Sequence, residues 1–115
     1  IPHEGPEKIY YDTGGLRSSG FLKDGKREGP QKIYYASGIL WREYYYRNGL
    51  KEGDAKTYYE NGALYAQGEY KEGKAVGVQK YYYEDGALKA ENNYGEHYSQ
   101  RTFDKNGKLI NEIVY

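Results

Sequence analysis

Apolar and polar residues alternate in short stretches along this chain, and the stretches return every 24 residues. In residues 53–76, one stretch ends in Tyr58 and Tyr59, a turn containing Gly62 follows, and the next stretch begins at Leu64. Period-2 alternation interrupted by glycine-containing turns is typical of β-strands joined as hairpins. The pattern therefore predicts two strands in each repeat and no helix.

Several positions keep their residue type from one repeat to the next, which indicates a repeat protein in which each unit packs on its neighbours. These positions are an opening glycine (Gly5, Gly29, Gly53, Gly77), a lysine (Lys8, Lys32, Lys56, Lys80), a tyrosine pair (Tyr10 and Tyr11, Tyr34 and Tyr35, Tyr58 and Tyr59, Tyr82 and Tyr83), a second glycine (Gly14, Gly38, Gly62, Gly86), a leucine (Leu16, Leu40, Leu64, Leu88) and a third glycine (Gly25, Gly49, Gly73).

The turns predict how the strands connect. Glu60-Asn61-Gly62 represents one class of turn, and Lys23-Asp24-Gly25 represents the other. For both classes we expect a three-residue hairpin with a bulge, in which two residues in a type I turn are followed by glycine at positive φ. Consecutive hairpins without crossover segments form a meander. The predicted fold is all-β, an elongated single-sheet antiparallel meander of about ten strands built from 24-residue hairpin repeats.

The repeats form one predicted domain, residues 1–115. Its units are residues 5–28, 29–52, 53–76 and 77–102, with a partial unit at 103–115. Residues 1–4 have no counterpart in the repeat, and we expect them to be weakly ordered. After Tyr94 the repeat shortens by three residues. Because an odd shift would reverse the faces of the next strand, we expect residues 95–101 to absorb it in a bulge or loop.

The repeat also predicts which residues share a face of the sheet. The first tyrosines, the leucines and the lysines are expected on one uniform face, together with small residues such as Ser18 and Ala66. The second tyrosines are expected on the other face, with positions that change between repeats, such as Trp41. Stacking residues must be present in every unit, whereas binding residues can vary. The uniform face is therefore interpreted as packing and the variable face as recognition.

Composition sets limits on the class of protein. Leu, Ile, Val and Phe make up only 18 of 115 residues, but 17 tyrosines supply large apolar rings in their place. The net charge is zero, with 17 basic and 17 acidic residues, which argues against nucleic acid as a partner. No apolar run approaches the ~20 residues of a membrane helix. Without cysteine the chain has no disulfide or thiolate zinc site, and this absence does not decide between a cytoplasmic and an exported location.

No catalytic constellation is present in the sequence. The two histidines are His3, in the lead-in, and His97, in the irregular segment, and surface positions explain both. Motifs typical of zinc proteases, serine hydrolases and nucleotide-binding loops do not occur. We predict no enzymatic activity, no cofactor and no metal site. The lysine column has two readings: a phosphate-binding stripe, or aliphatic stems lying across tyrosine rings with their ammonium groups in water.

Aromatic residues of the expected variable face form the candidate binding site. Tyrosine and tryptophan contribute strongly to binding at low entropic cost. The alternative reading is that these rings form a cross-strand packing ladder. The candidate residues are Tyr35, Trp41, Glu43, Tyr45, Tyr59, Tyr65 and Tyr83.

The unit Tyr-x-x-Gly-x-x-x-Gly-x-x-Lys-x-Tyr-Tyr-x-x-Gly-x-Leu, as it stands at residues 70–88, resembles the bacterial variant of the MORN repeat. The resemblance covers residues 5–115. It implies an elongated antiparallel meander without shared catalytic residues, and similar bacterial proteins are often labelled antitoxin or immunity partners of toxins.

The expected function is that of a non-catalytic protein-binding module. One form of such a module would be an immunity or antitoxin-type partner of a toxin. The alternative is a surface protein that stacks carbohydrate rings or lipid headgroups on its tyrosines. The two differ in their dependence on acidic residues: a basic toxin surface would need Glu43 and Glu91, whereas sugar stacking would not. Contact with a membrane surface and pairing with a second copy of the chain both stay open.

Overall fold

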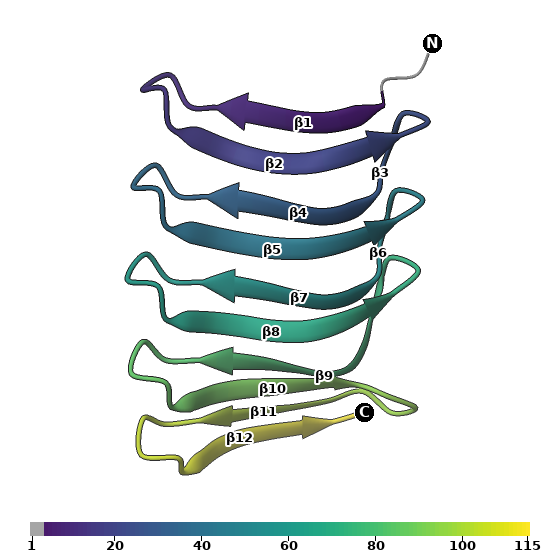
Figure 1. The fold of residues 1–115 in the computed structure, drawn as a ribbon. Helices are drawn as coiled ribbons and strands as arrows, with labels where there is room; N and C mark the ends of the chain where they lie inside the picture. The colour runs from purple at the N-terminus through teal and green to yellow at the C-terminus, as the bar shows by residue number, and fades with distance from the viewer. Residues whose placement is uncertain (1–3) are drawn as a thin grey trace.

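In the computed structural model, which describes residues 4–115, the strands lie side by side in one open antiparallel sheet (Figure 1). The lead-in residues 1–3, with His3, lie outside the described residues. The strands are β1 (Gly5–Tyr10), β2 (Leu16–Lys23), β3 (Lys26–Arg27), β4 (Gly29–Tyr34), β5 (Leu40–Arg47), β6 (Leu50–Lys51), β7 (Gly53–Tyr58), β8 (Leu64–Lys71), β9 (Lys74–Tyr82), β10 (Leu88–Tyr94), β11 (Ser99–Phe103) and β12 (Leu109–Val114). The molecule measures 52 × 34 × 15 Å, so it is one sheet thick.

Strand order in the sheet follows chain order, as expected for a meander. The path is β1-β2-β4-β5-β7-β8-β9-β10-β11-β12, and the two-residue strands β3 and β6 pair only with β2 and β5. Figure 1 shows the hairpin turns along both sides of the sheet, with β1 at one edge and β12 at the other. The predicted all-β meander of hairpin repeats is confirmed.

The two classes of turn differ more than the sequence suggested. In the class of Gly62, the amide of Gly62 donates to the carbonyl of Tyr59, and Gly62 has a φ of 89°, as predicted. In the other class, Asp24 and Gly25 both have positive φ, at 52° and 79°, and the flanking residues pair directly. This is a two-residue type I′ turn, so the prediction of three-residue turns there was wrong. The reason is that aspartate and asparagine tolerate positive φ before glycine.

A bulge in every repeat reverses part of the predicted faces. In the first repeat, Ile9 pairs with Ser18 but Tyr10 pairs with Leu16, so Arg17 is an extra residue in β2. The same shift recurs in the next two repeats, and the extra residue opposite β9 is Lys89. Because one inserted residue changes the alternation, the positions beyond the bulge lie on the face opposite to the one expected.

We name the two faces by their dominant residues. The tyrosine face carries Tyr11, Tyr35, Tyr59 and Tyr83, the bulge residues Arg17, Trp41, Tyr65 and Lys89, and Tyr44, Tyr46, Tyr70, Tyr81 and Tyr94. The lysine face carries Lys8, Lys32, Lys56 and Lys80, the first tyrosines Tyr10, Tyr34, Tyr58 and Tyr82, and Phe21 and Tyr45.

Neither face is a buried core. No apolar side chain among the described residues is fully buried, and the three buried polar residues are Ser18, Gln31 and Gln79. The expectation that one face serves for packing was therefore wrong. A sheet one layer thick has no second layer to cover either face, so its side chains pack sideways on those of neighbouring strands.

Complementary side-chain sizes hold adjacent repeats together on the tyrosine face. A Cβ atom placed on Gly20 would lie 2.7 Å from Oε1 of Gln31, and one on Gly68 would lie 1.6 Å from Oε1 of Gln79. The glutamine of one repeat thus occupies the space above the glycine of the previous repeat. At the boundary between β5 and β7, the register places Ala55 next to the large Tyr44. Each of these three boundaries combines one large residue with one small residue, whereas Asn92 lies opposite Gln100 between β10 and β11.

The shortened fourth repeat keeps its faces, as predicted. The loop between β10 and β11 contains Gly95, whose amide donates to the side chain of Asn93 at 2.9 Å. After this loop β11 pairs with β10 without a register shift, and Arg101 lies opposite Glu91. Since Glu91 also lies opposite Lys80, Arg101 occupies the position that lysine takes in the earlier repeats.

Candidate interaction face

A ladder of tyrosine hydroxyls links each repeat to the next on the tyrosine face. The hydroxyl of Tyr35 donates to the carbonyl of Tyr58 at 2.6 Å, and that of Tyr59 donates to the carbonyl of Tyr82 at 2.6 Å. Tyr11 makes the same bond to Tyr34, and Tyr83 makes it to Phe103. Because each bond joins consecutive hairpins, the second tyrosine of the pair has a structural role in every repeat.

The bulge residue of each repeat packs on the ladder tyrosine of the same repeat. Trp41 stacks on Tyr35 with ring centroids 5.3 Å apart, and Tyr65 meets Tyr59 edge-on at 5.0 Å. Arg17 lies over the ring of Tyr11, and Lys89 lies over the ring of Tyr83. The same bulge thus presents a different side chain in each of four repeats. The bulge residue is a cation in the first and fourth of these repeats and aromatic in the second and third.

Cations gather on the tyrosine face. In each cation–π contact of the described residues, the ring belongs to this face. Two contacts are close: Cζ of Arg42 lies 4.0 Å from the ring centre of Trp41, and Nζ of Lys51 lies 4.1 Å from that of Tyr44. Nζ of Lys51 also lies 5.1 Å from the ring centre of Tyr70. Rings attract such cations through their negatively charged faces.

Arg42 and Lys51 affect one another electrostatically. Partial burial lowers the pKa of Lys51, and the positive charge of Arg42 lowers it further. Burial also raises the pKa of Tyr35; the carboxylate of Glu60 raises this pKa further, and Arg42 lowers it. The centre of the tyrosine face therefore holds two cations, Arg42 and Lys51, that repel one another and form no ion pair within 4.0 Å among the described residues.

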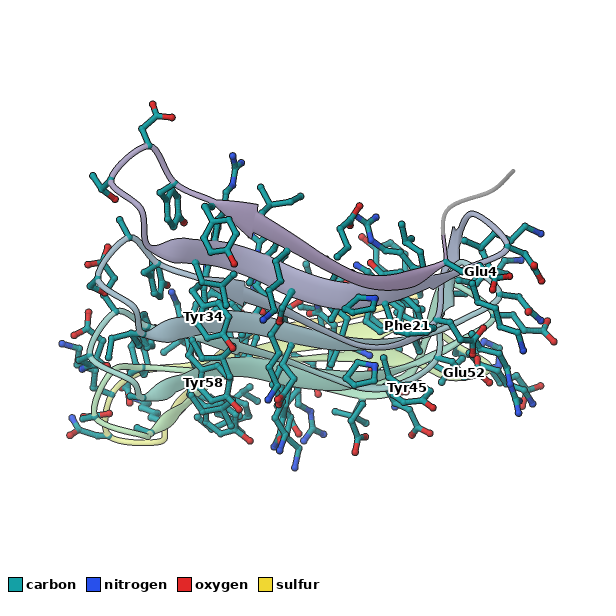
Figure 2. The ribbon with its side chains drawn as sticks, turned by 45° about the horizontal axis from the view of Figure 1, so that its top comes forward. Glu4, Phe21, Tyr34, Tyr45, Glu52 and Tyr58 are labelled. Atoms are coloured by element: carbon teal, nitrogen blue, oxygen red, sulfur yellow. The ribbon has the colours of Figure 1, made fainter. Side chains whose placement is uncertain are left out.

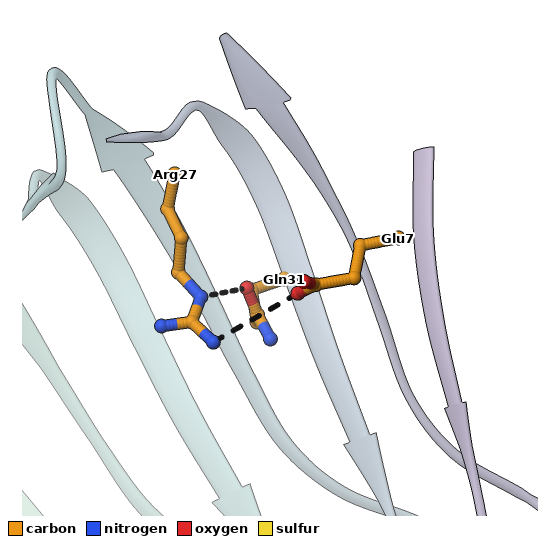
Figure 3. Close-up of polar contacts among 3 residues, drawn as sticks. All are labelled: Glu7, Arg27 and Gln31. Carbon is orange, nitrogen blue, oxygen red and sulfur yellow. Dashed lines mark hydrogen bonds and ion pairs between the residues drawn. The ribbon is translucent and has the colours of Figure 1, made fainter. Parts of the chain in front are cut away.

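One acidic residue compensates a cation on this face. Glu7 lies 4.0 Å from the guanidinium of Arg27, whose Nε donates to Oε1 of Gln31 at 2.9 Å (Figure 3). The other ion pair within the described residues joins Arg101 to Glu112 at 2.7 Å, and the register places it on the lysine face. Arg17, Arg42, Lys51 and Lys89 have no carboxylate within 4.0 Å among the residues that the structure describes.

The lysine column belongs to a row of side chains that crosses ten strands. Residues directly opposite one another in this row alternate between a cation and an acidic or neutral residue. The row reads Lys8, Ser19, Lys32, Glu43, Lys56, Gln67, Lys80, Glu91, Arg101, Glu112. Cross-strand pairs of opposite charge stabilise a sheet. Neither expected reading of the lysines included this arrangement.

The predicted site residues do not form one cluster. Tyr35, Trp41, Tyr59, Tyr65 and Tyr83 lie on the tyrosine face, as the sequence indicated. Glu43 and Tyr45 lie on the lysine face, because the bulge at Trp41 reverses the alternation after it.

Tyr45 is 49% exposed and lies with Phe21 towards one end of the strands, away from Tyr34 and Tyr58 (Figure 2). It borders an open groove of about 650 Å³ that Pro30, Glu43 and Asp54 also line. Glu28 and Glu52, at the same groove, accept hydrogen bonds from the amides of Asn48 and Glu72 in the type I′ turns. These two carboxylates therefore support the turns.

Arg42 and Lys51 were not predicted as site residues. The signal was available in the repeats, because the positions equivalent to Arg42 hold Ser18, Ala66 and Ala90. A charged residue at a position that is otherwise small indicates a local function. The sequence did not reveal that Lys51 lies over two tyrosine rings, because this contact depends on how β6 crosses towards β7.

Of the two histidines in the sequence, His97 is the one that lies among the described residues. His97 is exposed in the loop after β10. Residues 4–115 contain no group of three His, Asp or Glu side chains placed to hold a metal ion, and no helix able to cross a membrane. The groups that the tyrosine face presents are aromatic rings, cationic side chains and tyrosine hydroxyls.

Five segments of the chain match the family model of the MORN repeat variant: residues 4–24, 27–48, 51–72, 75–95 and 99–115. The chain belongs to the MORN repeat variant family. The matched segments begin near the start of each hairpin, so the family unit and the structural unit coincide. MORN repeats are in general non-catalytic modules that bind proteins or lipids. No curated protein matches the chain.

Two solved structures have segments similar to this MORN repeat chain. One is a chain in the crystal structure of accessory secretory protein 1, 2 and 3 in Streptococcus pneumoniae, with 16% identity and a TM-score of 0.49 over 89% of this chain and 19% of that one. The other belongs to a GtfA/B complex bound to UDP and GlcNAc, with 14% identity and a TM-score of 0.37 over 100% of this chain and 24% of that one. This chain thus spans a quarter or less of either.

Proposed function

We propose that this MORN repeat chain is a non-catalytic protein-binding module and that its tyrosine face makes the contact. The observation that supports this most is the row of half-buried rings formed by Trp41, Tyr65 and the ladder tyrosines, on a sheet without a second layer to cover it. Tryptophan, tyrosine and arginine are the residues that most often dominate binding at protein interfaces. All three types lie together around Trp41, where Tyr35 and Arg42 contact the indole ring.

The size of the sheet suits this role. A stable protein interface buries roughly 800 Å² on each partner. The two longer dimensions of the sheet, 52 and 34 Å, enclose a rectangle of more than twice that area. The cross-strand packing and the hydroxyl ladder also fix the side chains before binding. A pre-organised face loses less conformational entropy when a partner binds.

The narrower form of this proposal is an immunity or antitoxin-type partner of a toxin, and family resemblance is its only support. The alternative, stacking of carbohydrate rings or lipid headgroups, needs open ring faces. Trp41 and Tyr35 turn their ring faces towards one another, and Arg42 lies over Trp41. The arrangement therefore favours a protein partner over a stacked sugar.

Affinity capture from the source cells tests the proposal with two matched variants. Trp41→Ala removes an aromatic ring from the tyrosine face, and Tyr45→Ala removes one from the lysine face. We expect the unmodified chain and Tyr45→Ala to retain the same protein, identified by mass spectrometry, and Trp41→Ala to lose it. Unfolding curves of both variants must show folded protein at the capture temperature. Retention of the same protein by Trp41→Ala would contradict the use of the tyrosine face.

A further inference from the structure

The centre of the tyrosine face holds two cations that form no ion pair within 4.0 Å among the described residues. Arg42 lies on Trp41, and Lys51 lies between Tyr44 and Tyr70. By contrast, Arg27 occupies the position of Lys51 in the preceding repeat and has both a hydrogen bond to Gln31 and an ion pair with Glu7. The structure thus contains a compensated and an uncompensated version of the same position.

The uncompensated pair has an electrostatic cost. Lys51 is half-buried against rings, which removes part of its hydration, and the charge of Arg42 opposes its own. The lowered pKa of Lys51 reports that the site disfavours this positive charge in the free chain. An anion placed at the two cations would offset both effects, because an opposite charge stabilises the protonated lysine.

We propose, on the basis of the protein-binding function above, that the tyrosine face binds an acidic polypeptide segment whose carboxylates pair with Arg42 and Lys51. The surface requires charge complementarity: it carries Arg17, Arg42, Lys51 and Lys89 without close carboxylates. A guanidinium presents five N–H donors in a fixed planar arrangement. These groups are suited to the two oxygens of a carboxylate.

Other occupants fit the same face less well. A second copy of the chain whose two-fold axis passes through the site of Arg42 and Lys51 would place these cations against their own copies. Single-stranded nucleic acid uses open ring faces for base stacking, but here neighbouring rings and cations cover the faces of Tyr35, Trp41 and Tyr44. The lysine face supplies no further continuous cationic track, because Glu43 and Glu91 interrupt its lysines.

The test uses Trp41, the only tryptophan of the chain, as a fluorescent reporter beside the proposed site. The probes are a short peptide of alternating glutamate and phenylalanine, the same peptide with glutamine in place of glutamate, oligo-dT, and phosphatidylserine vesicles. The test variant is Arg42→Gln/Lys51→Gln. The matched control is Lys8→Gln/Lys32→Gln, which removes two cations from the lysine face. Circular dichroism confirms that every variant is folded.

We expect the glutamate peptide to bind the unmodified chain and the control equally, and to bind Arg42→Gln/Lys51→Gln about tenfold or more weakly. Binding should weaken with added salt, because it depends on charge. Equal binding of the glutamine peptide, tighter binding of oligo-dT or vesicles, or no binding of the glutamate peptide would each overturn the proposal. A captured protein that is lost in Trp41→Ala but kept by Arg42→Gln/Lys51→Gln would leave the protein-binding function standing without the acidic partner.

Discussion

The ring and the hydroxyl of each ladder tyrosine make different contacts. On the tyrosine face, the ladder hydroxyls bond to carbonyls of the next repeat, while the rings support the bulge residues. On the lysine face, Tyr45 is half-exposed, and its hydroxyl makes no hydrogen bond within the described residues. Tyrosine thus replaces the aliphatic core that a sheet one layer thick cannot bury.

Removal of one ladder hydroxyl should destabilise the fold. Tyr59→Phe keeps the ring against Tyr65 but leaves the carbonyl of Tyr82 without this donor. We expect a loss of about 1 kcal/mol in the free energy of unfolding, as for a typical internal hydrogen bond. Tyr45→Phe is the control, and urea denaturation of both variants is the measurement. Equal midpoints for the two variants would show that the ladder does not contribute to stability.

At the level of single residues, the sequence predicted less than it did for the backbone. Trp41 and Tyr35 were correctly placed on one face, but Glu43 and Tyr45 were placed with them. Both residues were assigned to the wrong face for the same reason. The bulge adds a residue to one strand without changing the repeat length of 24, so the spacing of the repeat does not reveal it. Both a regular and a bulged hairpin satisfy the same spacing of tyrosine, glycine and leucine.

Among the elements, the boundaries between hairpins depend on matched side-chain sizes. Gln79 lies above Gly68, with its Nε2 3.0 Å from the carbonyl of Glu69. Gln31 lies above Gly20 in the same way. Each such glycine is needed for a close approach, because a methyl group at Gly68 would overlap the carboxamide of Gln79.

A double-mutant cycle tests this boundary. Gly68→Ala should displace the carboxamide of Gln79 and cost about 1–2 kcal/mol, because a buried polar group loses its hydrogen bond. In the background of Gln79→Ala, the same change at Gly68 should cost much less, since the methyl group then has space. Chemical denaturation of the four proteins gives the coupling. Additive effects would mean that the two residues do not share this space.

The turns show what the sequence could predict about elements. The hairpin turns lie where the sequence predicted them. Few residues other than glycine adopt a positive φ, so the recurring glycines mark the turns. The type of the second class was wrong, since the choice between a two-residue and a three-residue hairpin depends on the φ of Asp24 and Asn48. Glu72 takes the same conformation, at a φ of 50°, where its amide donates to the carboxylate of Glu52. A contact from another repeat thus fixes the local backbone.

At the scale of the whole molecule, the flat shape gives a simple prediction for small-angle scattering. The Cα radius of gyration is 16.6 Å, whereas a compact chain of this length would have about 13–14 Å. We expect a measured value near the larger figure and a longest dimension near 52 Å. A value in the compact range would show that the sheet folds back on itself in solution.

The density of half-buried tyrosines should make the fold sensitive to alkali. Burial raises the pKa of Tyr58, Tyr59, Tyr70 and Tyr81 above their ordinary value of 10.0. The folded chain therefore keeps phenolic protons that the unfolded chain releases near pH 10. This stability is fully present below that pH and is lost as the pH rises through the raised pKa values.

The melting temperature should accordingly fall as the pH rises above about 10, with tyrosinate absorbance rising as the sheet unfolds. Lys51 acts in the opposite direction, because its pKa is lowered, but it is one group against several. Tyr81→Phe should make the fall less steep. A melting temperature that does not change over this range would show that the rings are hydrated as in the unfolded chain.

The order of the strands gives the molecule a mechanical direction. Because each strand lies beside its neighbour in sequence, a force that pulls β1 away from β12 across the strands acts on one strand pair at a time. Hairpins would then peel off in succession at low force. A force along the strands of a single hairpin would shear all of its ladder bonds together and meet far greater resistance. The repeats would therefore separate one after another when the two edges of the sheet are pulled apart, whereas each hairpin would resist a force along its own strands.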